Sequence, residues 1–316
     1  MDESFINTVI KYIAFLFEWS NIYEMKKKLL LNKVAIITGA SDGLGYEIAK
    51  RFILEGANIT ICSRNKKRLE IANKNLIKIS DLNQKILSIS ADVSQQSDVK
   101  NVIDQTIKKF GHCEILVNNA GIYGPKGKIE DVDWEEWKKT FEINLFGSIL
   151  MIKNLLKYFK KKKYGKIIQL SGGGATNPMP NISAYASSKA GIVRFVETIA
   201  LEVGDFKIYA NSVAPGALNT KMLDEVIKSG PNKVGIDYYK RALKQKKSGG
   251  NSINNAVNLI TFLASPQSDG ITGKLISAVW DNWEEWSKHT ESLFNSDVYT
   301  LRRIIGRDRG FSWGDK

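Results

Sequence analysis

The sequence predicts an α/β protein built around one doubly wound parallel sheet. From residue 33 onwards, short apolar runs of strand length alternate with longer segments of helical periodicity. Units of this length favour parallel strands joined by right-handed crossovers, with helices on both faces of the sheet. Glycine-containing and polar motifs follow several of the strands, at the edge where ligands bind in such sheets.

Each element is predicted from its apolar pattern. The expected strands span residues 34–38, 58–62, 85–90, 115–117, 165–170, 208–213 and 275–279. The expected helices span residues 45–55, 97–110, 134–159, 185–203 and 253–263, with a further basic helix from about residue 66. Residues 221–252 are polar, lysine-rich and contain glycine, which favours a mobile lid.

The length of 316 residues fits a single domain of this class with an extension at each end. We expect an N-terminal extension at 1–30, the α/β domain at 31–280, and a C-terminal tail at 281–316 that covers the substrate or contacts another subunit. Met25 begins a basic and apolar stretch that leads into the first strand, so residues 1–24 are expected to be dispensable.

Residues 5–19 are mostly apolar, but a membrane-spanning helix needs about 20 apolar residues. The stretch also lacks the basic start and cleavage site of a secretory signal. An amphipathic helix lying on a membrane or on a partner subunit is the alternative. We expect no membrane contact.

The formal net charge is +13, and a basic protein of this kind can bind nucleic acid. However, the excess is mostly scattered lysine without an arginine-rich run that alternates with aromatics, so no nucleic-acid partner is expected. Cys62, Cys113 and the two histidines lack the spacing of a metal or redox site. These features predict a metal-free, reduced, cytoplasmic protein.

Residues 38–45, Thr-Gly-Ala-Ser-Asp-Gly-Leu-Gly, join the first predicted strand to the first predicted helix. Glycines at this point allow a tight turn and let a pyrophosphate approach the backbone. The helix N-terminus adds free N–H groups and a positive dipole end. The turn therefore predicts a Rossmann-type dinucleotide site, with contacts from Gly39, Ser41, Asp42, Gly43, Leu44 and Gly45.

The spacing of this turn departs from G-x-G-x-x-G, since three residues separate Gly39 from Gly43. It resembles the turn of the short-chain dehydrogenase/reductase family, in its compact one-domain branch. The resemblance continues in order over residues 33–279 through Asp92-Val93, Asn118-Asn119-Ala120-Gly121, Asn144, Ser171, Tyr185-x-x-x-Lys189 and Pro215-Gly216.

The resemblance implies further cofactor contacts. Asp92 and Val93 would meet the adenine, and Asn119, Ala120 and Gly121 would line the cofactor. The nicotinamide carboxamide would be received by Pro215, Gly216, Leu218 and Thr220. A plain helix-capping role for Asp92 and a purely structural role for Asn118 are the alternatives.

The end of the second strand favours NADP(H) over NAD(H). It carries Ser63, Arg64 and Asn65, without the carboxylate that holds the ribose 2′-hydroxyl in NAD enzymes. An arginine can pair with a 2′-phosphate, and the two neighbours can add hydrogen bonds. Alternatively, Arg64 merely begins a basic surface helix. Asp42 tempers the prediction, since family members with a basic residue there gain another phosphate contact.

Tyr185 and Lys189 are four residues apart and share one face of a predicted helix. A tyrosine has an unperturbed pKa of about 10, and a nearby ammonium group lowers that pKa by favouring the phenolate. We therefore expect Tyr185 to be the general acid/base of a hydride-transfer reaction. By resemblance, Lys189 would also hold the nicotinamide ribose, and Asn144 the water that links Lys189 to solvent.

The resemblance also implies a serine that hydrogen-bonds the substrate oxygen. Ser171 is the expected residue, although it lies fourteen positions before Tyr185 where many relatives have thirteen. That spacing could place the family position on Gly172. An inserted residue in the loop 172–181 would restore the alignment to Ser171, and Ser183 is a further candidate hydroxyl.

The sequence thus predicts an NADP(H)-preferring oxidoreductase acting on a small carbonyl or alcohol substrate. Trp280, Trp283 and Trp286 lie beside acidic and amide groups, which suits stacking on a sugar-like substrate, or packing against the protein's own core or a partner subunit. The alternatives are a 3-oxoacyl-thioester reductase and, in another class, a non-catalytic dinucleotide-binding sensor or scaffold. By resemblance, we expect a homodimer or homotetramer built on the helices at 134–159 and 185–203.

Overall fold

The computed structural model describes residues 28–313, and its centre is a seven-stranded sheet in the order β3-β2-β1-β4-β5-β6-β7. All of its neighbouring strands are parallel. The strands are β1 (Val34–Thr38), β2 (Asn58–Ser63), β3 (Ile86–Ser90), β4 (Ile115–Asn118), β5 (Gly165–Leu170), β6 (Ile208–Ala214) and β7 (Leu275–Ser277). The order reverses between β1 and β4, so the predicted doubly wound sheet is confirmed.

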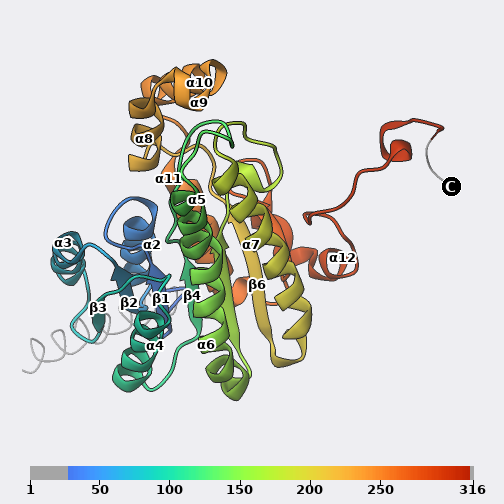
Figure 1. Cartoon of the computed structure of the whole chain (residues 1–316). Helices are drawn as coiled ribbons and strands as arrows, with labels where there is room; N and C mark the ends of the chain where they lie inside the picture. Colours follow the sequence, from blue (N-terminus) through green and yellow to red (C-terminus); the bar gives the residue numbers. More distant parts are fainter. Residues whose placement is uncertain (1–27, 314–316) are drawn as a thin grey trace, which may run out of the picture.

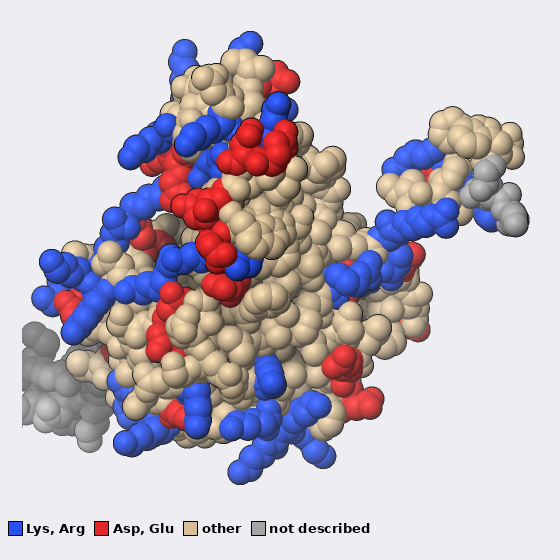
Figure 2. Space-filling model, viewed as in Figure 1, with Lys and Arg blue, Asp and Glu red and all other residues tan. Residues whose placement is uncertain are grey.

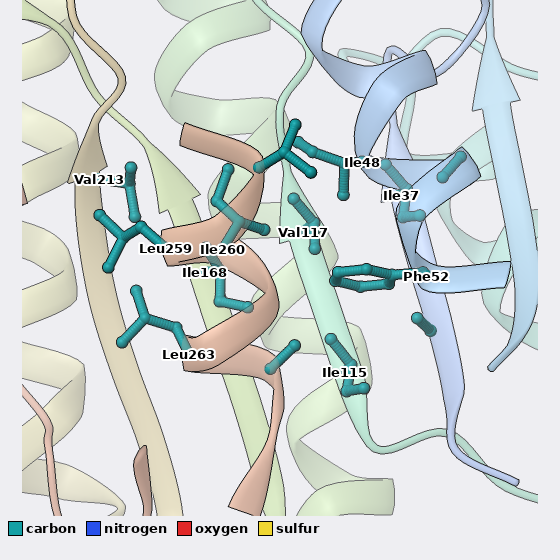
Figure 3. Close-up of a cluster of buried hydrophobic side chains, with 14 of the residues drawn as sticks. Ile37, Ile48, Phe52, Ile115, Val117, Ile168, Val213, Leu259, Ile260 and Leu263 are labelled. Atoms are coloured by element: carbon teal, nitrogen blue, oxygen red, sulfur yellow. The ribbon is translucent and has the colours of Figure 1, made fainter. Parts of the chain in front are cut away.

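Helices α2 (Gly43–Leu54), α3 (Lys66–Ile77) and α11 (Ile253–Ala264) cover one face of the sheet. Figure 3 shows Phe52 of α2 and Leu259 of α11 packed among strand residues such as Ile37 and Val117. Successive residues of a strand point to opposite faces, so continuous apolar strands supply a core on each side.

The opposite face is covered by α4 (Gln96–Phe110), α6 (Gly147–Lys162) and α7 (Ser183–Glu202). Helix α5 (Trp134–Phe141) packs against α7. Helices α4, α6 and α7 stand side by side in Figure 1. Ile36, the neighbour of Ile37 in β1, packs into this second core with Leu155 and Val196. Both faces are therefore closed, as the alternating pattern of elements predicts.

The predicted elements agree with the observed ones to within a few residues, with two differences. The helix expected at 134–159 is interrupted by a π-helical segment, η1 (Glu142–Phe146), between α5 and α6. The final strand is shorter than the predicted 275–279 and ends at Ser277. A π-helical turn is a local widening of a helix that hydrophobic periodicity does not reveal, and such turns are frequent at functional sites.

Residues 221–252, expected to form a lid, are mostly helical: α8 (Lys221–Ser229), α9 (Pro231–Val234) and α10 (Ile236–Ser248). These helices lie beyond the strand ends, at the top of Figure 1. Their apolar side chains form a small core of their own around Leu223, Val226, Val234 and Ala242. Only these few side chains are buried in the small core, so the rest of the sequence of these helices is mainly polar.

The tail after β7 packs back on the domain before it leaves it. Trp283 contacts Phe262 of α11, and Trp286 is buried against Tyr299. The segment includes the 3-10 helix η5 (Trp283–Lys288) and the short α12 (Thr290–Phe294). The chain then extends away from the body (Figure 1), and this last part contains the 3-10 helix η6 (Gly306–Arg309). The domain boundaries expected at 30 and 280 stay predictions, although Leu30 already lies in the core.

On the face in Figure 2, basic side chains are spread over the lower rim, the upper helices and the extended C-terminal segment. None of the helices within residues 28–313 is long and apolar enough to cross a membrane. The predictions for residues 1–24 and 5–19 concern a part of the chain outside the described residues.

Candidate functional site

The glycine turn between β1 and α2 leaves a strip of bare backbone at the sheet edge. Gly39 and Gly43 adopt positive φ angles of 65° and 56°, which glycine accommodates without strain. A Cβ on Gly39 would lie 2.9 Å from the Cα of Ala120, and one on Gly45 would lie 2.5 Å from the carbonyl oxygen of Gly39. Side chains are thus excluded at Gly39 and Gly45, and the turn leads directly into the N-terminus of α2. This cradle fits a pyrophosphate.

Hydrogen bonds hold the turn after β4 against the glycine turn. The hydroxyl of Thr38 accepts from the backbone N–H groups of Asn119 and Ala120, both at 3.0 Å. The Asn119 amide donates to the carbonyls of Thr38 and Gly39 at 3.0 and 3.2 Å. The structure therefore brings the predicted residues 39–45 and 119–121 together at one edge of the sheet. Thr38 acts here as a positioning residue.

The ends of β2 and β3 lie at the same edge of the sheet. The hydroxyls of Ser41 and Ser63 form a hydrogen bond of 2.9 Å, which links the glycine turn to the end of β2. The Arg64 guanidinium lies 3.8 Å from a carboxylate oxygen of Asp92, and both side chains are partly exposed. Asn65 caps α3 by accepting from the N–H of Arg68 at 3.0 Å.

Asp92 belongs to a turn rather than to a helix cap. One of its carboxylate oxygens accepts from the N–H and the hydroxyl of Ser94 at 3.0 and 2.8 Å. The N-cap of α4 is Gln95. The carboxylate oxygen near Arg64 is the other one, so the turn leaves it directed at the end of β2. Val93, the expected adenine neighbour, is buried.

Tyr185 and Lys189 lie on α7 and are both buried, with 8% and 4% of their surface exposed. The Lys189 ammonium nitrogen is 5.8 Å from the centre of the Tyr185 ring. It donates a hydrogen bond of 2.8 Å to the carbonyl of Leu170 at the end of β5. The predicted pair is therefore assembled where β5 ends.

Asn144 lies in the π-helical segment and is fully buried. Its amide oxygen accepts from the N–H of Ile122 at 2.8 Å, and its amide nitrogen donates to the carbonyl of Ile122 and the hydroxyl of Ser188. A Cβ on Gly121 would lie 3.2 Å from the Asn144 amide oxygen and 3.6 Å from the Lys189 nitrogen. Asn144 and Lys189 thus converge on the turn after β4.

Burial, rather than charge, dominates the electrostatics of the pair. Burial first, and the neighbouring Tyr238 phenol second, raise the pKa of Tyr185 above its usual range. Burial lowers the pKa of Lys189 to about 8. The expected lowering of the Tyr185 pKa is therefore not met in this structure, because burial, which disfavours the phenolate, is the largest influence on it.

The structure places Gly172, not Ser171, against the Tyr185 hydroxyl. A Cβ on Gly172 would lie 2.3 Å from that oxygen. Ser171 continues the pairing of β5 with β6, and adjacent residues of an extended chain point to opposite faces. Its buried hydroxyl has no hydrogen-bond partner within the described residues. The other candidate, Ser183, accepts a hydrogen bond from the Trp137 ring nitrogen at 3.1 Å.

The segment after β6 also lies beside the glycine turn. Gly216 has a φ of 87°, and a Cβ there would lie 2.6 Å from a methyl group of Val279. The side chain of Thr220 lies near Gly43, and the following Lys221 forms an ion pair with Asp42. Leu218 packs against the first core. The segment from Pro215 to Thr220, expected at the nicotinamide, thus adjoins the glycine turn.

Two tyrosines that sequence analysis missed join this site. The Tyr123 ring lies 4.6 Å from the Tyr185 ring, centre to centre, at an angle of 55°. The hydroxyl oxygens of Tyr123 and Tyr238 are 3.2 Å apart. Tyr123 follows the turn motif by two residues and could have been suspected from that position. Tyr238 belongs to α10, and no pattern in the sequence predicts that this helix lies above the site.

The tryptophan cluster has no common place at this site. Trp283 and Trp286 pack on the core, while Trp280 is exposed. Trp283 also lines a hollow of about 590 Å³ with residues of α2 and α11, and none of the predicted catalytic or cofactor-binding residues lines that hollow. The packing role considered for Trp283 and Trp286 is therefore the one the structure shows.

Comparison with known proteins identifies what this arrangement resembles. The family model described as short chain dehydrogenase matches residues 33–230. The chain is 33% identical over 251 residues to "Dehydrogenase/reductase SDR family member 4" of Caenorhabditis elegans, covering 77% of this chain and 92% of that protein. It is 31% identical to "(2S)-[(R)-hydroxy(phenyl)methyl]succinyl-CoA dehydrogenase subunit BbsD" of Thauera aromatica, covering 78% and 94% of the two chains.

Solved structures show the same similarity. Levodione reductase superposes with a TM-score of 0.72 at 25% identity, covering 81% of this chain and 98% of that one. NAD⁺-bound xylitol dehydrogenase superposes with a TM-score of 0.72 at 25% identity, covering 78% and 98%. These similarities agree with the parallel seven-stranded sheet of this chain.

Proposed function

Because the chain belongs to the short-chain dehydrogenase family, we propose that it is an NADP(H)-preferring oxidoreductase with Tyr185 as its general acid/base. It would move a hydride between the nicotinamide and a carbonyl or alcohol substrate. The observation that carries the proposal is the burial of Tyr185 and Lys189 on one face of α7, at the strand end beside the glycine cradle. When bound, the nicotinamide supplies or accepts the hydride, and the protein supplies position and proton transfer.

The site fits a nicotinamide dinucleotide because Gly39 and Gly45 leave bare backbone where a side chain would collide with neighbouring atoms. The glycine turn and the N-terminus of α2 would hold the pyrophosphate. Asp92 and Val93 would lie at the adenine, and the segment from Pro215 to Thr220 at the nicotinamide. The holding residues proposed are Gly39, Ser41, Asp42, Gly43, Leu44, Gly45, Ser63, Arg64, Asn65, Asp92, Val93, Asn119, Ala120, Gly121, Tyr185, Lys189, Pro215, Gly216, Leu218 and Thr220.

Tyr185 holds its proton at neutral pH because burial raises the pKa of the phenol. It is therefore ready to protonate a carbonyl oxygen as that oxygen gains negative charge. Giving up this proton leaves a phenolate, which the buried ammonium of Lys189 stabilises. In the reverse direction the phenolate takes the proton of an alcohol. Asn144, fixed by three hydrogen bonds, would hold the relay that returns a proton to Lys189 from solvent.

The preference for NADP(H) rests on the end of β2. No carboxylate follows that strand, and the hydroxyl pair of Ser41 and Ser63 offers donors to a 2′-phosphate. Arg64 is half-exposed and 3.8 Å from Asp92, so it can turn from a loose ion pair to a phosphate. The opposing observation is the NAD⁺ bound by the similar xylitol dehydrogenase.

The substrate proposed is a small ketone or secondary alcohol, polyols included. Levodione reductase and xylitol dehydrogenase act on small molecules of these kinds by their names, which supports the choice. Trp283 and Trp286 are committed to the core, so they give no support to sugar stacking. The similarity to "(2S)-[(R)-hydroxy(phenyl)methyl]succinyl-CoA dehydrogenase subunit BbsD", whose name gives a CoA thioester, supports a thioester substrate as the alternative. A homodimer or homotetramer in the cytoplasm remains our prediction, with exposed Phe146 and Leu201 available on the long helices.

A titration of the purified protein with NADPH and with NADH, followed by nicotinamide fluorescence, tests the cofactor proposal. Tight binding of NADPH and weak binding of NADH would support it. Tight binding of NADH alone would refute the NADP(H) preference while keeping the enzyme class. Failure to bind either would mean that the glycine cradle is not a working cofactor site.

A further inference from the structure

The residue that meets the Tyr185 hydroxyl at the end of β5 has no side chain. Gly172 occupies this position, and a Cβ there would lie 2.3 Å from the Tyr185 oxygen. The hydroxyl of Ser171 is buried and has no hydrogen-bond partner within the described residues. The residue that faces the Tyr185 oxygen therefore offers a substrate no side-chain donor.

Two phenols from other elements lie close to Tyr185 instead. The rings of Tyr123 and Tyr185 are in contact, with centres 4.6 Å apart. Tyr238 joins them from α10 through a hydroxyl-to-hydroxyl distance of 3.2 Å to Tyr123. The loop after β4, helix α7 and helix α10 thus each contribute one tyrosine to a single cluster.

The paired hydroxyls leave one donor unused. A hydrogen bond between two hydroxyls uses one of the two hydrogens, so the accepting phenol can still donate its own. Tyr123 is half-buried, and its pKa is raised first by burial, then by Tyr185 and then by Tyr238. If Tyr238 donates to Tyr123, the free hydrogen belongs to the phenol that packs on Tyr185.

We propose that Tyr123 is a further catalytic residue, whose hydroxyl donates to the substrate oxygen that Tyr185 protonates, and that Tyr238 is its positioning residue. This inference rests on the proposed function. It makes the unit α8–α10 part of the active site, because α10 supplies Tyr238. The proton that reaches the product still comes from Tyr185, and Tyr123 keeps its own.

The test uses the full-length protein with NADPH and 2,2,2-trifluoroacetophenone, an activated ketone, as the probe. Tyr123→Phe keeps the ring that packs on Tyr185 and removes only the hydroxyl. We expect its kcat to fall about 100-fold, as for loss of one preorganised donor to a developing oxyanion. Tyr238→Phe should lower kcat about 10-fold with little change in KM, because the Tyr123 hydroxyl remains but loses its orientation. Tyr239→Phe, a neighbouring tyrosine on the same helix, is the matched control and should keep the wild-type rate.

A second measurement does not depend on turnover. In a Tyr185→Phe background, the ketone is added to the NADPH complex and its Kd is taken from nicotinamide fluorescence. Adding Tyr123→Phe should weaken this Kd about 10-fold, whereas adding Tyr239→Phe should not. Unchanged NADPH affinity and circular dichroism would show that each variant is folded.

Several outcomes would overturn the inference. Wild-type kcat and ketone affinity in Tyr123→Phe, with Tyr185→Phe inactive, would refute it and leave the proposed function standing. Loss of activity in Ser171→Ala but not in Tyr123→Phe would return the role to the serine. Full activity in Tyr185→Phe would contradict the proposed function itself. A wild type that binds NADPH but neither binds nor reduces the ketone would contradict both.

Discussion

The ammonium group of Lys189 donates a hydrogen bond of 2.8 Å to the backbone carbonyl of Leu170, the last residue of β5. This bond ties α7 to the end of the strand, and two residues further on Gly172 meets the Tyr185 hydroxyl. The geometry of the proposed acid/base pair is thus set by backbone atoms of β5. Backbone positions in the middle of a sheet are rigid, which suits a group that must stay aligned with a reacting carbon.

The contact between Gly172 and Tyr185 predicts that a single methyl group is disruptive. In Gly172→Ala the new Cβ would lie 2.3 Å from the Tyr185 oxygen, and the Tyr123 ring restricts how far Tyr185 can move. We expect kcat to fall at least 10-fold and the free energy of unfolding to fall by about 1–3 kcal/mol, as in overpacked cores. Gly173→Ala is the matched control, since a Cβ there meets nothing within 4 Å. Equal kcat and equal urea midpoints for the two variants would show that the contact is not confining.

Arg64 is predicted to determine the preference between the cofactors. Arg64→Asp removes the proposed partner of the 2′-phosphate and places a carboxylate where NAD enzymes carry one. The Kd for NADPH should rise about 10- to 100-fold, as for loss of a charged hydrogen bond, and the Kd for NADH should not rise. Lys74→Asp makes the same charge change at the far end of α3 and serves as the control. An unchanged ratio of the two Kd values in Arg64→Asp would refute the role of Arg64.

Most of the strands were predictable because they are short, largely apolar runs buried on both faces, as Val34–Thr38 illustrates. The pair of Tyr185 and Lys189 was predictable because its spacing is local to one helix. The contact between Tyr123 and Tyr238 was not, since it joins residues 115 positions apart through a helical unit with its own small core. Likewise, the choice between Ser171 and Gly172 depends on which residue faces α7, and a one-residue shift of an extended chain reverses that face.

Burial of Lys189 predicts a pH-dependent contribution to stability. Its folded pKa of about 8 lies below the unfolded value of about 10.4, so the unfolded state binds more protons between these values. Stability contributed by this site therefore rises as pH increases from about 8 to about 10, by up to about 1.4 kcal/mol per pH unit.

Urea unfolding of the wild type and of Lys189→Met, from pH 7 to pH 9.5, measures this contribution as a difference. The wild type should gain stability relative to the variant as pH rises through 8. Lys153→Met, which replaces an exposed lysine of α6, should show no such difference. A constant difference between wild type and Lys189→Met would contradict the burial of the ammonium group.

The most direct test of the whole account follows the hydride and the proton together. Turnover of 2,2,2-trifluoroacetophenone with NADPH carrying deuterium at either face of nicotinamide C4 is analysed by mass spectrometry, for the wild type and for Tyr185→Phe. The account predicts that one of the two labels appears in the alcohol product of the wild type. It also predicts that Tyr185→Phe binds NADPH within about 2-fold of the wild type but loses at least about 100-fold in kcat. A product that carries neither label, or a Tyr185→Phe variant that turns over at the wild-type rate, would contradict it.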